Sequence, residues 1–164
     1  LNKKSNTRKI CLAYAGEHFH FEKKIIKIAN NNKKWEIKYF ARNQTNKNFP
    51  KNIKIFKPSK DKFLKYMKLT KCVLCTSGFQ LTQECIFNNI PVAIMPCSQQ
   101  HFEQVFNFNK YTKILKWAVP ITSNLNLDKL SKRNINKYTN NLKKLLLNRN
   151  QIIKKNIKKI IKNH

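Results

Sequence analysis

Residues 72–84 read CVLCTSGFQLTQE, and this stretch decides the fold. The first five residues form a short apolar run that predicts a buried strand. Gly78 follows within two residues, and residues 80–88 have the composition of a helix that Asn88 and Asn89 could end with a left-handed residue. A buried strand that passes through a glycine turn directly into a helix is half of a βαβ unit. The stretch therefore predicts an α/β domain with a parallel sheet.

The same alternation of strand and helix extends in both directions along the 164 residues. We predict an α/β, Rossmann-like parallel sheet of about six strands flanked by helices, in one domain spanning residues 1–164 with a core at about 9–121. Ligands of such sheets bind beyond the carboxyl ends of the strands. The predicted strands are 9–15, 35–41, 52–56, 72–76, 91–95 and 118–121; the predicted helices are 21–29, 61–67, 80–88, 101–110 and 128 to about 162, broken near 140–141.

The formal charge of +28 comes from lysine far more than arginine, since only four of the 35 basic residues are Arg. Proteins that bind phosphates and bases favour the bidentate fork of Arg. The lysines also accompany 23 Asn and many Ile, a composition that A/T-rich codons produce in any kind of protein. Nucleic acid is therefore not the expected partner, although a Lys-rich nucleic-acid-binding module stays an alternative. The surface should still attract anions such as acidic lipids and nucleoside diphosphates.

The five cysteines are an odd, scattered set, which is no disulfide framework and indicates a reducing compartment, here the cytoplasm. Cys72 and Cys75 have the spacing of a metal or dithiol pair, but residues three apart on a strand point to opposite faces. We expect buried thiols, no metal site and no cofactor.

The sequence has two glycines, Gly16 and Gly78, and each lies just after a predicted strand and just before a helix. Such turns are either plain tight turns or places where helix-start N–H groups meet an anion. Ser77 with Gln80 is predicted to form a capping box on the second helix. Glu84, one and a half turns into that helix, is either a solvated residue or a carboxylate that accepts hydrogen bonds from ribose hydroxyls.

Three segments together, 73–84, 89–96 and 102–107, resemble the carboxyl-terminal domain of glycosyltransferase family 28 and the nucleotide-sugar box of UDP-glycosyltransferases. In those families a strand ends in a small polar residue and Gly, a Glu follows six residues later, and a Gly-x-Pro turn leads to a strand that ends in Pro. Gly78, Glu84, Pro91 and Pro96 match, while Asn89 replaces the Gly. The resemblance covers about residues 9–121 and is specific over 76–104.

The resemblance implies a role for each matching residue. It implies diphosphate binding by Gly16, Ser77, Gly78 and Phe79, ribose binding by Glu84, sugar binding by Gln100, Glu103 and Gln104, and base contacts from Ile55 and Phe56. His18, His20 and His101 have no matching role. The base that deprotonates the acceptor comes from the amino-terminal domain in that family, so no catalytic residue is predicted here.

The implied function is transfer of a hexosyl group from a nucleoside diphosphate sugar, expected to be UDP-linked, to an acceptor hydroxyl. Because the sequence begins at Leu1 rather than Met, we expect the donor-binding half of a GT-B fold, with the acceptor half in a missing amino-terminal domain or a partner subunit. The alternatives are the catalytic subunit of a two-chain lipid-linked-sugar transferase and a sugar-nucleotide epimerase. The Lys-rich helices over 128–164 either pack on protein or lie on the cytoplasmic face of an anionic membrane.

Overall fold

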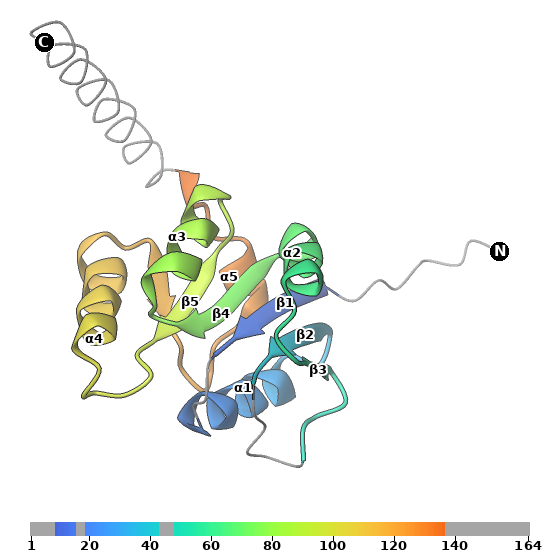
Figure 1. Ribbon diagram of the computed structural model, residues 1–164. Helices are drawn as coiled ribbons and strands as arrows, with labels where there is room; N and C mark the ends of the chain where they lie inside the picture. Colours follow the sequence, from blue (N-terminus) through green and yellow to red (C-terminus); the bar gives the residue numbers. More distant parts are fainter. Residues whose placement is uncertain (1–8, 16–18, 43–47, 137–164) are drawn as a thin grey trace, which may run out of the picture.

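The computed structural model describes residues 9–15, 19–42 and 48–136, and in them a six-stranded sheet forms the centre of the molecule (Figure 1). All five strand pairings are parallel, in the order β3-β2-β1-β4-β5-β6. The predicted Rossmann-like architecture is therefore confirmed. The strands are β1 (Lys9–Tyr14), β2 (Trp35–Phe40), β3 (Ile53–Phe56), β4 (Cys72–Thr76), β5 (Val92–Met95) and β6 (Ala118–Pro120).

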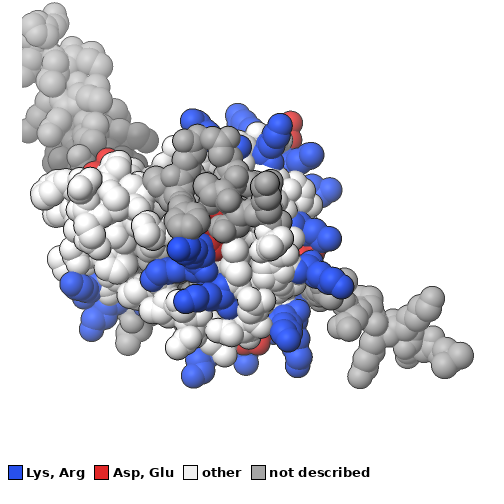
Figure 2. Space-filling view, turned by 90° about the horizontal axis from the view of Figure 1, so that it is seen from below, with Lys and Arg blue, Asp and Glu red and all other residues white. Residues whose placement is uncertain are grey.

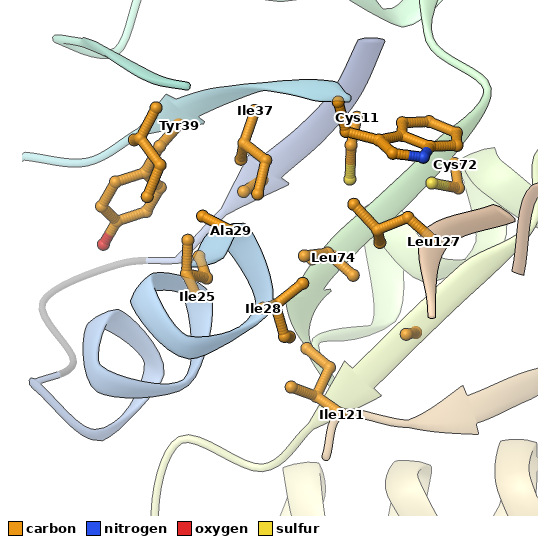
Figure 3. Close-up of a cluster of buried hydrophobic side chains, with 14 of the residues drawn as sticks. Cys11, Ile25, Ile28, Ala29, Ile37, Tyr39, Cys72, Leu74, Ile121 and Leu127 are labelled. Atoms are coloured by element: carbon orange, nitrogen blue, oxygen red, sulfur yellow. The ribbon is translucent and has the colours of Figure 1, made fainter. Parts of the chain in front are cut away.

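Helices cover both faces of the sheet and bury a separate core on each. One core packs α1 and α5 against the sheet, and Figure 3 shows Ile25 and Ile28 of α1 beside Ile37 and Leu74 of the strands. The other core lies beneath α2, α3 and the segment that follows α4. The helices are α1 (Phe19–Asn31), α2 (Lys60–Leu69), α3 (Phe79–Phe87), α4 (Phe102–Asn109) and α5 (Leu127–Ser131).

The strands alternate their side chains between the two cores, as a period of two requires. Cys72 belongs to the core under α1, whereas Cys75 belongs to the core under α3. All five cysteines are buried and free, and the described residues contain no group of three or more potential metal ligands. The prediction of buried thiols is confirmed. None of the helices in the described part of the chain combines the length and apolar composition of a membrane span.

Two helix boundaries differ from the sequence prediction. The helix predicted from residue 128 onward ends at Ser131, and residues 133–135 are irregular, so the break comes earlier than the predicted 140–141. The remainder of that predicted helix lies outside the described residues. The helix over 101–110 is α4, which continues as a π-helical turn, Lys110–Ile114, closed by the bond from Leu115 N–H to the Lys110 carbonyl. Asn89 has φ 55°, which confirms the left-handed stop after α3.

Candidate functional site

A cavity of about 590 Å³ opens between α2 and α3 where the central strands end. Its floor consists of the last residues of three neighbouring strands, Tyr14, Phe40 and Cys75 with Thr76. This place is the carboxyl edge of the sheet beside the β1–β4 boundary, where the strand order reverses and α/β domains bind ligands. The walls come from Pro58, Ser59, Lys60, Phe63 and Leu64 on one side and from Gly78, Phe79, Gln80, Leu81 and Glu84 on the other.

Two helices begin at the rim of this cavity without a side-chain cap. Ser59 is the N-cap residue of α2 and Gly78 that of α3, and neither helix has a capping bond from a side chain. The first N–H groups of a helix have no partner within the helix, and the aligned peptide dipoles add partial positive charge there. Both walls thus offer hydrogen-bond donors to an anionic ligand.

Ser77 does not cap α3, so the predicted capping box is wrong. Its side chain is fully buried, and its hydroxyl donates a 2.7 Å hydrogen bond to the backbone carbonyl of Gln104 in α4. The cap position moves one residue on, to Gly78, and Gln80 instead donates to Glu84 Oε1 at 3.3 Å. The cause is tertiary packing, because α4 presents a carbonyl to the hydroxyl that would otherwise turn toward α3.

Glu84 and Gly78 both line this cavity. Six residues of α-helix separate them by about 9 Å along the axis, a length that a ribose and the diphosphate on its 5′ carbon can bridge. Gly78 has an ordinary φ of −63°, and a Cβ added there would meet nothing within 4 Å. Backbone conformation and protein contacts therefore do not require glycine here, whereas the close approach of a ligand would.

The three residues predicted to bind the transferred sugar do not line this cavity. Gln100 and Glu103 are exposed, and Glu103 accepts a 3.4 Å hydrogen bond from Asn107. Gln104 accepts a 3.0 Å hydrogen bond from the Cys97 N–H through its Oε1 atom. The Gln104 side chain thus holds the loop after β5 against α4. That loop forms one wall of a second hollow, about 680 Å³ in volume, whose other residues include His20, Lys24 and Lys113.

The predicted base contacts, Ile55 and Phe56, do not line the cavity. Phe56 stacks on Phe40, with ring centroids 5.2 Å apart, so it supports the floor from behind. Ile55 packs on the opposite core. The chain just after β3, from Pro58 to Lys60, forms the wall instead. Gly16 and His18 lie outside the described residues, and His101 is the exposed N-cap residue of α4.

The sequence of this chain matches the model of glycosyl transferase family 1 over residues 2–143. The chain belongs to glycosyl transferase family 1. No curated protein matches its sequence significantly.

Solved structures place this family 1 domain among known glycosyltransferase folds. It superposes on the glycotransferase of kitacinnamycin with a TM-score of 0.56 at 13% identity, over 81% of this chain and 37% of that one. It superposes on MurG of Acinetobacter baumannii with a TM-score of 0.50 at 11% identity, over 76% of this chain and 39% of that one. The likeness is one of fold, and the chain spans less than two fifths of the length of either protein.

Most residues of the glycosyl transferase domain that line the cavity were not among the predicted site residues, including Tyr14, Ser59, Phe63 and Thr76. Alternation along β1 could have found Tyr14, since Leu12 two residues earlier faces the same core. The α2 residues had no such signal, because their distance from Glu84 depends on how α2 packs beside α3.

The charges around the glycosyl transferase domain favour anionic ligands. Seen from below (Figure 2), Lys and Arg cover much more of the visible surface than Asp and Glu. At the cavity itself, Lys60 and Glu84 stand on opposite walls. Burial raises the pKa of the Cys75 thiol to about 12, so Cys75 stays protonated at physiological pH and serves as apolar lining.

Proposed function

We propose that this chain is the donor-binding half of a GT-B glycosyltransferase that transfers a hexosyl group from a nucleoside diphosphate sugar, UDP-linked, to an acceptor hydroxyl. The family membership supports glycosyl transfer, and the donor, the sugar and the acceptor are the proposed part. A single observation carries the proposal. The uncapped start of α3 and the Glu84 carboxylate open onto the same cavity at the carboxyl edge of the sheet.

The nucleoside fits this cavity by its chemistry. An apolar wall that contains Phe63 and Leu64 suits the faces of a base. Glu84 lies on the opposite wall, where one carboxylate oxygen accepts a 3.3 Å bond from Gln80. A partly exposed bond of that length exchanges readily for bonds from the two ribose hydroxyls.

The diphosphate then reaches the start of α3, at Gly78 and Phe79. As the bond from the anomeric carbon to the diphosphate breaks, negative charge grows on the leaving phosphate oxygens. The N–H groups of the helix start are fixed before the reaction, so they stabilise this charge without reorganising. Gln100, Glu103 and Gln104 are proposed to orient the transferred sugar, with Gln104 acting through the loop that it holds at Cys97.

The whole chain is proposed to act as one donor domain that resembles the carboxyl-terminal domain of glycosyltransferase family 28. The acceptor and its base would come from a second domain or subunit, consistent with the 37% and 39% of the superposed proteins that this chain spans. Cytoplasmic location and contact with an anionic membrane stay predictions.

Titration of the chain with UDP tests the proposal. We expect Glu84→Gln to weaken UDP binding by about 10- to 100-fold, because it replaces the charged acceptor of the ribose bonds, each of which contributes about 1.5–3 kcal/mol. Isothermal titration calorimetry measures the affinity, and circular dichroism checks that the variant folds.

Asp128→Asn is the matched control. It also removes one negative charge, but Asp128 pairs with Lys9 at the opposite end of β1, where both side chains are half exposed. We expect UDP affinity to change by less than about twofold, because an exposed pair far from the site contributes little. Equal UDP affinity in wild type and Glu84→Gln would refute the ribose assignment, and no UDP binding by the wild-type chain would refute the proposed donor.

A further inference from the structure

Tyr14 occupies the centre of the cavity floor. It is the last residue of β1 and pairs with Phe40 on one side and with Cys75 on the other. All three side chains face the core under α2 and α3. Tyr14 therefore stands between the α2 wall, which carries Phe63, and the α3 wall, which carries Glu84.

Among the described residues, the Tyr14 side chain is held by its ring and not by its hydroxyl. The ring meets Phe63 edge to face, with centroids 5.7 Å apart. No residue of the described chain donates to the hydroxyl or accepts from it. Two other tyrosines show the contrast, since the Tyr39 hydroxyl donates to Glu22 and the Tyr111 hydroxyl accepts from Gln83. A phenol fixed by its ring and lacking a partner is a preformed hydrogen-bonding group for a ligand.

We propose that the Tyr14 hydroxyl hydrogen-bonds the ribose of the bound nucleotide and so shares with Glu84 the positioning of the donor. This inference rests on the proposed function. In the proposed complex the base packs on the apolar side of the cavity near Phe63, and the diphosphate binds at the start of α3 at Gly78. The ribose joins these two groups, so it lies above the middle of the floor, where Tyr14 ends β1.

The Tyr14 hydroxyl can donate a hydrogen bond, which the Glu84 carboxylate cannot do. A carboxylate only accepts hydrogen bonds, whereas a phenol both donates and accepts. Tyr14 can therefore donate to a ribose oxygen while Glu84 accepts from the ribose hydroxyls. Tyr14 is a positioning residue in this scheme, because it touches the nucleotide away from the bond that breaks.

Tyr14→Phe tests the inference, because it removes the hydroxyl and keeps the ring on Phe63. Affinities for UDP, by calorimetry, and for uridine, by NMR titration, should both fall about three- to tenfold, as expected for one neutral hydrogen bond. Tyr66→Phe is the control. Tyr66 belongs to α2 and packs on Phe40 but does not line the cavity, so removing its hydroxyl should leave both affinities within twofold.

The outcomes separate this inference from the proposed function. If Glu84→Gln weakens UDP binding and Tyr14→Phe does not, the Tyr14 assignment is overturned while the donor proposal stands. If Tyr14→Phe weakens UDP binding but leaves uridine binding unchanged, the hydroxyl contacts the diphosphate and the ribose assignment is overturned. If the wild-type chain binds neither ligand, the proposed function itself fails.

Discussion

Replacing Ser77 by alanine separates a packing role of this residue from a role in binding the donor. The Ser77 hydroxyl is fully buried and donates to the Gln104 carbonyl at 2.7 Å, across 27 residues of sequence. The Ser77→Ala variant would keep the backbone and the Cβ, but it would remove this hydrogen bond and leave a small void beside the Gln104 carbonyl. A buried hydrogen bond of this kind contributes about 1–2 kcal/mol. For a chain of this size, such a loss lowers Tm by roughly 2–8 °C.

Thermal unfolding followed by circular dichroism measures the change in Tm, and UDP titration measures any change in affinity for the donor nucleotide. We expect the drop in Tm with UDP affinity changed by less than about twofold, since the hydroxyl is already used within the protein. Ser59→Ala is the matched stability control, because Ser59 holds the N-cap position of α2 without a side-chain capping bond, and we expect its Tm to stay within about 2 °C of wild type. An unchanged Tm for Ser77→Ala together with a tenfold loss of UDP affinity would show that the hydroxyl belongs to the ligand.

Two further predictions concern the turn and the floor of the cavity. Gly78→Ala should leave Tm almost unchanged, since φ at Gly78 is −63° and the new Cβ meets nothing within 4 Å. It should nevertheless weaken UDP binding about tenfold or more, because the Cβ occupies space that the ligand needs. A UDP titration of this variant that shows wild-type affinity would contradict the prediction. Stability should also fall as pH rises from 9 toward 12, because burial raises the pKa of Cys75 from its ordinary value of 9.0 to about 12. The folded protein holds this proton more tightly than the unfolded chain does. The resulting contribution to the free energy of unfolding is fully present below pH 9 and is lost progressively as the pH rises above it. Urea unfolding of Cys75→Ala should show a shallower alkaline decline, and an identical slope would refute the assignment.

Alternation and turn residues were enough to predict the sheet. The run Cys72–Thr76 is a strand with the predicted bounds, and Asn89 ends α3 in the left-handed conformation. These features depend on residues close in sequence, because side-chain period and backbone preference act locally. Gly78 and Glu84 belong to a single turn and helix, and both line the cavity, as the resemblance to known glycosyltransferases implied.

The hydrogen-bond partners of the site were not predictable in this way. Ser77 was expected to cap α3, yet its hydroxyl bonds α4, and the Gln104 side chain holds Cys97. The cavity wall from Ser59 to Leu64 comes from α2, far from Glu84 in sequence. In each case the deciding neighbour arrives by packing of another element.

The sequence by itself determined the parallel α/β architecture, the edge of the sheet where a ligand would bind, and the helix that carries Gly78 and Glu84. Only the tertiary structure decided that α2 forms the wall facing Glu84, that the Ser77 hydroxyl bonds α4 and that α5 stops at Ser131. The physical reason is that periodicity fixes which face of its own element a residue occupies. Which partner it meets there depends on how separate elements pack, and a hydroxyl or a ring binds whichever group packing brings within reach.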